Sequence, residues 1–287
     1  MAVGRHLSSM KKHRSKWKDM TFIAAMDHSG GSTGGVLERY RREYTEENKM
    51  DLVHDMRLRM INNHNFNSNH IWAAIVYKDS VDRGIVKVLE RKGINTYLKI
   101  DSGCEEDGTL KPFPVQKMIE YAKNNQCIGT KMRSIVKTME VLDTILEQQF
   151  AYATTIYKAG LMPIIEPEIP IDHPKKDLLE KLLNVRLRAY LENYTGMCIL
   201  KLTLPEEPDQ YLHISKSPKV HKLVGLSGGY DNKEACDRLA LNNNMTASFS
   251  RALSEHLYYD DSDENFDVAI TKNILNIVRA SNAGSES

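Results

Sequence analysis

The chain has 287 residues, of which 41% are hydrophobic and 27% are charged, a composition typical of globular proteins and not of low-complexity chains. Its 39 Lys and Arg residues nearly balance 38 Asp and Glu residues, so no overall electrostatic field favours a nucleic acid or an anionic membrane as partner. No apolar run approaches the ~18 residues of a membrane-spanning helix. Any anion that this protein binds must therefore be held by a local cluster of charges.

Residues 1–18 contain six basic residues and no acidic one. We interpret residues 1–20 as a basic leading segment, either a solvated helix or a targeting segment. The four cysteines are scattered and form no CxxC pair, which indicates unpaired thiols in a reducing compartment and a cytoplasmic location. The ten histidines form no HxxxH pattern, so we expect no metal and no other cofactor.

Eight short apolar runs recur along the chain, each followed by turn residues and usually by a helical pattern. They span residues 22–27, 71–77, 94–101, 127–133, 161–168, 197–204, 220–227 and 245–251. The runs show no strict alternation of polar and apolar residues, which is typical of strands buried on both faces.

Longer segments with helical periodicity lie between the runs, at residues 51–61, 136–159, 177–191 and 266–280. Eight strands that alternate with helices predict an α/β fold, a closed (β/α)₈ TIM barrel, whose typical length is ~250 residues. An open doubly wound sheet is the alternative, but the GxGxxG motif expected after its first strand is missing. No linker divides the chain, so we expect a single domain over residues 1–287 that ends in a short flexible tail at 282–287.

Charged or polar residues close nearly every predicted strand. They are Asp27, Lys99, Asp101, Lys131, Arg133, Glu166, Glu168, Lys201, Ser227 and Arg251. In a parallel barrel the strand ends converge on the face where active sites are built. Each residue taken alone could simply mark the point where a strand meets solvent, but three lysines inside or just past apolar runs favour a shared site.

Lys201 lies within the apolar run Met-Cys-Ile-Leu-Lys-Leu-Thr-Leu at residues 197–204. A free lysine has a pKa of ~10.4 and is a poor nucleophile at neutral pH. Desolvation, or a neighbouring cation such as Lys131, would lower that pKa and free the amine to attack a carbonyl. The alternative is a lysine whose stem runs along the barrel rim to water. The strand alone does not decide between them.

Glu166 and Glu168 flank Pro167 and, two residues apart on a strand, should point the same way. Two close carboxylates cannot both ionise at low cost, so one of them would stay protonated and could shuttle protons. The alternative is a surface pair that caps the next helix.

Two glycine-containing turns follow predicted strands and could bind phosphate. Ser227-Gly228-Gly229 follows the seventh strand, where barrels commonly bind phosphate through backbone N–H groups and a helix N-terminus, and Arg251 could add a counter-charge. Ser29-Gly-Gly-Ser32 follows the first strand and, with Lys99, could bind a second phosphate.

Whole motifs of the chain resemble the class I, Schiff-base-forming fructose-bisphosphate aldolases in their short bacterial form. The matching segments, in the family's order, are FIAAMDHSGGST (22–33), LKIDSG (98–103), GTKMRS (129–134), GLMPIIEPEI (160–169), LKLTLP (200–205), LSGGY (226–230) and ASFSRAL (247–253). Seven ordered segments make a chance match implausible.

The resemblance implies reversible cleavage of fructose 1,6-bisphosphate to dihydroxyacetone phosphate and glyceraldehyde 3-phosphate, without a metal. Lys201 matches the Schiff-base lysine, and Lys131 matches the second active-site lysine. Glu166 matches the acid/base that dehydrates the carbinolamine, and Glu168 matches the carboxylate beside it. Asp27 matches the residue that takes the hydroxyl proton when the carbon–carbon bond breaks.

The resemblance also implies two phosphate sites. The residues matching the site next to the reacting ketone are Ser227, Gly228, Ser250 and Arg251. Those matching the other phosphate are Ser29, Ser32 and Lys99, with Arg133 helping to position that distal end.

Two residues depart from the family pattern. Ser102 stands where the family usually has a lysine, and His28 stands where short-form members often have Gln. A Schiff-base aldolase for a different sugar phosphate, such as a monophosphate, is therefore one alternative. A barrel used mainly as a binding or scaffold protein is a second, and its sign would be a missing catalytic lysine or acid. The composition leaves a homo-oligomer open.

Overall fold

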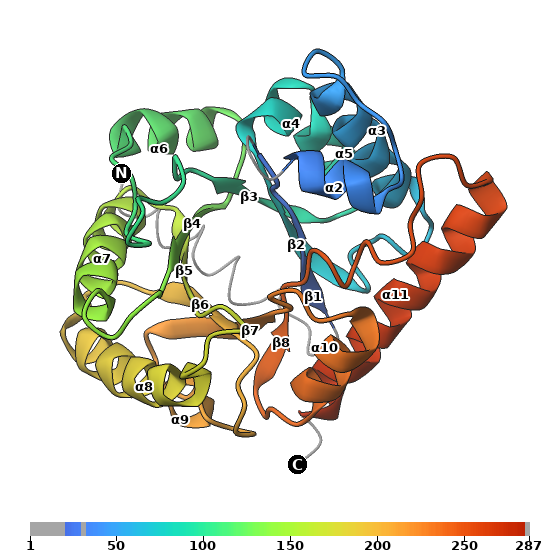
Figure 1. Ribbon diagram of the computed structural model, residues 1–287. Coiled ribbons are helices and arrows are strands. Elements are labelled where there is room, and N and C mark those ends of the chain that lie inside the picture. Colours follow the sequence, from blue (N-terminus) through green and yellow to red (C-terminus); the bar gives the residue numbers. More distant parts are fainter. Residues whose placement is uncertain (1–20, 30–32, 285–287) are drawn as a thin grey trace.

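The structure, a computed structural model, describes residues 21–29 and 33–284 and shows strands surrounded by helices (Figure 1). The strands are β1 (Phe22–Met26), β2 (Ile71–Val76), β3 (Asn95–Lys99), β4 (Gly129–Ile135), β5 (Met162–Glu168), β6 (Cys198–Thr203), β7 (Val220–Leu226) and β8 (Met245–Ala247). Their spatial order follows the chain from β1 to β8, and neighbouring strands are parallel. This order excludes the doubly wound sheet, in which the strand order reverses.

Hydrogen bonds between β1 and the β8 segment close the sheet. The backbone N–H of Ala25 donates to the carbonyl of Phe249 at 3.0 Å, and Thr246 Oγ1 donates to the carbonyl of Thr21 at 2.8 Å. The first and last strands therefore lie side by side, and the predicted (β/α)₈ barrel is confirmed (Figure 1).

Helices cover the outside of the barrel (Figure 1). They are α2 (Thr33–Arg39), α3 (Lys49–Asn62), α4 (Lys78–Asp82), α5 (Ile85–Arg91), α6 (Val115–Asn124), α7 (Leu142–Lys158), α8 (Lys176–Asn193), α9 (Leu212–Ser215), α10 (Asn232–Ala240) and α11 (Asp263–Ala283). The four predicted helical segments correspond to α3, α7, α8 and α11. Among the described residues, no helix has the length and hydropathy required to cross a membrane.

Several predicted boundaries were wrong. Helix α7 begins at Leu142 and not at residue 136, because the backbone N–H of Val136 donates to the Glu168 carbonyl at 2.8 Å and keeps this segment beside β5. Strand β8 ends at Ala247, after which the chain bends toward β1. Helix α11 runs through Ala283, so the first two residues of the predicted tail are helical. The predicted leading segment and residues 285–287 lie outside the described residues.

The strands are buried on both faces, as predicted. Their outward side chains pack with the helices into a large apolar core. Inward side chains form a second cluster inside the barrel: Ile23, Ala25, Trp72, Ala73, Ile75, Tyr97, Met162, Ile164, Ile199 and Val224.

Side chains two residues apart on a strand point to the same side, so the inward rows of this cluster continue toward the carboxyl ends of the strands. Ile199 belongs to the cluster, so Lys201 points to the same side. Ile164 likewise leads to Glu166, and Ala25 leads to Asp27. The pleat that packs the barrel interior therefore also directs charged side chains into its mouth.

Gly129, at the start of β4, should be intolerant of a side chain. A Cβ atom there would lie 2.2 Å from the Met162 carbonyl oxygen of the neighbouring strand and 2.3 Å from Cε1 of Tyr97, whose ring packs inside the barrel. We expect Gly129→Ala to lower the free energy of unfolding by about 1–3 kcal/mol, because packed backbone and ring must move. Urea unfolding measures this loss.

Gly35→Ala is the matched control, because a Cβ at this position of α2 would meet only Arg39 Nη1 at 3.8 Å. A helical Gly→Ala change should be neutral or stabilising by up to ~1 kcal/mol. Equal stability of the two variants would contradict the packing argument.

Candidate active site

A cavity of about 650 Å³ opens at the carboxyl ends of the strands and is lined by residues from all eight strands or from the segments that follow them. Every predicted site residue that the structure describes lines it: Asp27, Ser29, Lys99, Lys131, Arg133, Glu166, Glu168, Lys201, Ser227, Gly228, Ser250 and Arg251. The remaining one, Ser32, lies outside the described residues. The volume is in the range of small-molecule sites.

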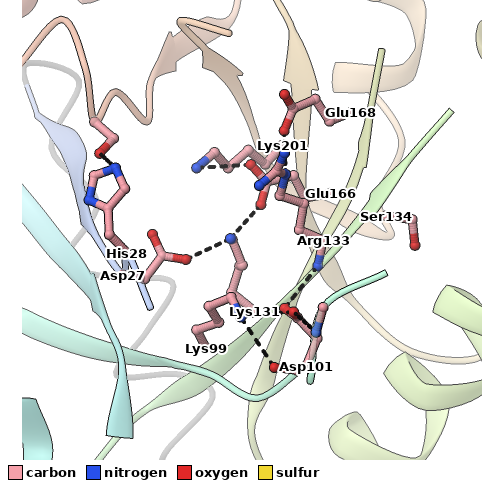
Figure 2. Close-up of polar contacts among 12 residues, drawn as sticks. Asp27, His28, Lys99, Asp101, Lys131, Arg133, Ser134, Glu166, Glu168 and Lys201 are labelled. Carbon is pink, nitrogen blue, oxygen red and sulfur yellow. Dashed lines mark hydrogen bonds and ion pairs between the residues drawn. The ribbon is translucent and has the colours of Figure 1, made fainter. Parts of the chain in front are cut away.

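A chain of four charged side chains crosses the floor of the cavity (Figure 2). Lys131 Nζ lies 2.6 Å from Asp27 Oδ2 and 2.7 Å from Glu166 Oε2. The other oxygen of Glu166, Oε1, lies 3.1 Å from Lys201 Nζ. Lys131 and Glu166 are each 3% exposed and Lys201 is 4% exposed. Buried charges need such partners, because each would otherwise lose its hydration without compensation.

The charge chain shifts the pKa values of its ends. Burial alone would raise the pKa of Asp27, but the ammonium groups of Lys131 and Lys201 outweigh it and hold the pKa well below the usual range. Burial would likewise lower the pKa of Lys131, but the Asp27 and Glu166 carboxylates raise it above its ordinary value. Lys131 is therefore a fixed ammonium group and Asp27 a fixed carboxylate in the substrate-free site.

The two interpretations of Lys201 can now be distinguished. The side chain does not extend along the rim to water, since it is buried and ends at Glu166 in the cavity. Its neighbours Leu200 and Leu202 face the outer apolar core. The sequence suggested Lys131 as a cation close to Lys201. The two amines do lie close together, since they contact opposite oxygens of the Glu166 carboxylate.

Glu166 and Glu168 have different partners. Glu168 Oε2 lies 2.5 Å from Arg133 Nε, farther from the floor than Glu166 (Figure 2). Burial raises the pKa of Glu168, although Arg133 opposes the shift. The pair is therefore not a surface cap for the next helix, and Glu168 is the carboxylate whose pKa moves toward neutrality.

Asp101 connects β3 to β4 at the rim. Its Oδ1 lies 2.9 Å from Lys99 Nζ and accepts a hydrogen bond from Gly103 N, and its Oδ2 accepts one from Arg133 N at 3.2 Å. Lys99 is thus paired with a carboxylate before any ligand binds. In the described part of the chain, no three His, Cys, Asp or Glu side chains gather as ligands for a metal ion.

The turn after β7 brings backbone close to the cavity. Gly228 and Gly229 have φ values of 59° and 122°, and a Cβ on Gly228 would lie 2.5 Å from Ile171 Cγ2, so glycine is required here. The helix that follows this turn already has a side-chain cap at its N-terminus. The Asp231 side chain accepts a hydrogen bond from Glu234 N at 2.7 Å and so places its own carboxylate at the start of α10.

Sequence reasoning noted His28 only as a departure, but the structure gives it a specific contact. His28 Nε2 lies 3.1 Å from Ser250 Oγ, and the His28 carbonyl accepts a hydrogen bond from buried Arg57 at 2.7 Å. Burial lowers the pKa of His28 to about 4, against the attraction of Asp27. A neutral imidazole therefore ties the β1 turn to the β8 turn. Its position next to Asp27 was the only sequence signal.

A (β/α)₈ barrel with a charged cavity at the carboxyl face of its strands has the architecture of a barrel enzyme. A class 1 fructose-bisphosphate aldolase from Clostridium acetobutylicum is 38% identical over 283 residues, covering 92% of this chain and 96% of that protein. The chain therefore belongs to the class I fructose-bisphosphate aldolases.

The fold agrees with that of a solved fructose-bisphosphate aldolase. Fructose-bisphosphate aldolase from Plasmodium falciparum, determined in complex with TRAP and a small-molecule inhibitor, matches with a TM-score of 0.79. The match covers 98% of this chain and 96% of that one at 17% identity. No protein-family model matches the chain.

The buried imidazole generates a prediction about pH. An unfolded histidine has a pKa of ~6.5, whereas burial lowers the pKa of folded His28 to about 4. Between these values the unfolded chain binds more protons, so the contribution of neutral His28 is complete above pH ~6.5 and lost as the pH falls toward 4. His28→Gln removes this titration. As the pH falls from about 7.5 to about 4.5, the free energy of unfolding of the variant should therefore rise by on the order of 2 kcal/mol relative to that of wild type.

Urea unfolding of both proteins at the two pH values measures the difference. A stability difference that is the same at both pH values would show that His28 does not titrate as this environment requires.

Proposed function

We propose that this protein reversibly cleaves fructose 1,6-bisphosphate into dihydroxyacetone phosphate and glyceraldehyde 3-phosphate through a Schiff base on Lys201. The observation that carries the proposal is the buried Lys201 amine, 3.1 Å from Glu166 Oε1 inside a cavity that also exposes cations suited to phosphate. The name of the Clostridium relative supports the same substrate.

The first half of the reaction joins substrate and enzyme. The Lys201 amine adds to the ketone carbon and forms a carbinolamine. Glu166 contacts the amine already, so it can take up the proton that the Lys201 nitrogen loses and give it to the departing hydroxyl group, which leaves as water. The product is a protonated imine between Lys201 and the sugar.

The second half breaks the carbon–carbon bond. Asp27 accepts the proton of the hydroxyl group on the carbon of the breaking bond that becomes the aldehyde, while the bonding electrons move into the protonated imine and leave an enamine. The aldehyde product departs, and protonation and hydrolysis of the enamine release the ketone product. Lys131, 2.6 Å from Asp27, stabilises the negative charge of that carboxylate.

Binding of the substrate would use both ends of the cavity. The phosphate next to the ketone would lie against Ser227, Gly228, Ser250 and Arg251. The other phosphate would lie toward Ser29, Ser32 and Lys99, near Arg133. All of these except Ser32 line the cavity, which supports a bound sugar phosphate.

The alternatives are less well supported. A scaffold barrel would have no reason to keep a complete chain of Asp27, Lys131, Glu166 and Lys201, since burying charge is costly. A monophosphate substrate would leave the distal cations without a role. We also propose a cytoplasmic location, because the four cysteines are unpaired.

Trapping of the imine tests the proposed function. Borohydride added with fructose 1,6-bisphosphate should reduce the imine and leave a stable adduct on Lys201, which peptide mapping by mass spectrometry locates. Lys201→Met removes the amine at similar size and should abolish both adduct and cleavage, a loss of at least about 10³-fold for a nucleophile.

Lys131→Met is the matched control for this experiment. It should cleave slowly but still form some adduct on Lys201, because the nucleophile remains. An adduct that maps to Lys131 in wild type, or no substrate-dependent adduct at all, would overturn the assignment.

A second prediction concerns metal removal. Because the protonated imine accepts the electrons of the breaking bond, no metal ion is needed for this step. We expect cleavage activity to be unchanged after prolonged dialysis against EDTA. Strong inhibition that zinc reverses would instead indicate a metal-dependent cleavage.

A further inference from the structure

The cations that line the cavity differ in whether a carboxylate already neutralises them. They are Lys99, Lys131, Arg133, Lys137, Lys201 and Arg251. Lys99 pairs with Asp101, Lys131 with Asp27 and Glu166, Arg133 with Glu168, and Lys201 with Glu166. Among the described residues, neither Lys137 nor Arg251 has a carboxylate within 4.0 Å. These two are therefore the cavity-lining cations without a carboxylate in contact, although the Asp107 carboxylate acts on Lys137 from a greater distance.

Lys137 and Arg251 lie on opposite sides of the barrel. Lys137 follows β4 by two residues, and Arg251 follows β8. In a closed sheet with the order β1 to β8, these two strands are four positions apart and face each other across the barrel (Figure 1). The Schiff-base lysine is on β6, between them. Such an arrangement suits a substrate with an anionic group at each end.

The backbone of Lys137 is fixed while its ammonium group stays available. The backbone N–H of Val136 donates to the Glu168 carbonyl, and His173 Nε2 lies 3.0 Å from the Lys137 carbonyl oxygen. The Nζ atom donates to the Glu106 carbonyl at 2.7 Å, which is a neutral acceptor. An ammonium group has three N–H donors, so two remain for an anion.

We propose that Lys137 binds the phosphate of the substrate that lies farther from the reacting ketone, and that it determines the preference for a bisphosphate over a monophosphate. The proposal rests on the proposed function. Lys99 and Arg133, which the sequence suggested for this end, are already neutralised by Asp101 and Glu168. Lys137 supplies an ammonium group that no carboxylate of the described residues contacts.

Steady-state kinetics of Lys137→Met tests the role in specificity. Loss of a charge-assisted hydrogen bond should lower kcat/KM for fructose 1,6-bisphosphate by about tenfold or more. The value for fructose 1-phosphate, which lacks the distal phosphate, should stay within about twofold, because the rest of the site is unchanged. Lys117→Met, at an exposed position of α6 outside the cavity lining, is the control and should leave both values unchanged.

Lys137→Arg separates charge from packing. It retains a cation at the same position, so it should recover most of the bisphosphate preference that Lys137→Met loses. An equal loss on both substrates in Lys137→Met, or no loss on either, would overturn the proposal.

A binding measurement distinguishes failure of this proposal from failure of the proposed function. Hexitol 1,6-bisphosphate and hexitol 1-phosphate have no ketone, so their binding does not require a Schiff base. Calorimetry should show that Lys137→Met weakens binding of the bisphosphate by about tenfold and leaves that of the monophosphate unchanged. Absence of cleavage by wild type would end the proposed function, while these affinities would still decide the role of Lys137. Equal affinities of wild type and Lys137→Met for the bisphosphate would contradict it.

Discussion

The structure of the site depends on one buried carboxylate that contacts two lysines. Glu166 places one oxygen on Lys131 and the other on Lys201, and Asp27 adds a second carboxylate to Lys131 only. Removing Lys131 would leave Asp27 without a charged partner, and removing Glu166 would leave Lys201 without one, and a buried charge left alone in this way is strongly destabilising. The two lysines therefore differ in their environment, because two carboxylates contact Lys131 and only one contacts Lys201.

The barrel fold makes these different contacts of the two lysines possible. Four different strands or the turns after them supply the four side chains (Figure 2), and those of Asp27, Glu166 and Lys201 continue inward rows of residues that pack the interior. Apolar residues below the charges exclude water, so the ion pairs act at low dielectric. Above them the cavity widens to loops that carry glycines and cations, where the polar groups of a sugar phosphate can be bound.

Much of this arrangement could be predicted from the sequence because it depends on local patterns. The eight apolar runs give the strands, and the family motifs, together with the apolar run around it, give Lys201 its predicted role. Contacts between distant residues could not be predicted. His28 meets Ser250 across 222 positions of the chain. Lys137 was wrongly assigned to a helix, because the hydrogen bonds to β5 and its following loop that keep this segment outside α7 join residues far apart in the sequence. Which lysine pairs with which acid depends on strand register and side-chain conformation, and neither is visible in the sequence.

Competitive labelling of the substrate-free protein tests the central claim most directly. A limiting amount of formaldehyde with cyanoborohydride near neutral pH alkylates amines that are free to lose a proton, and peptide mapping compares the two lysines. Lys131 is held as an ammonium ion by Asp27 and Glu166, so the account predicts that Lys201 is alkylated well before Lys131. Alkylation of Lys131 at an equal or greater rate would contradict it.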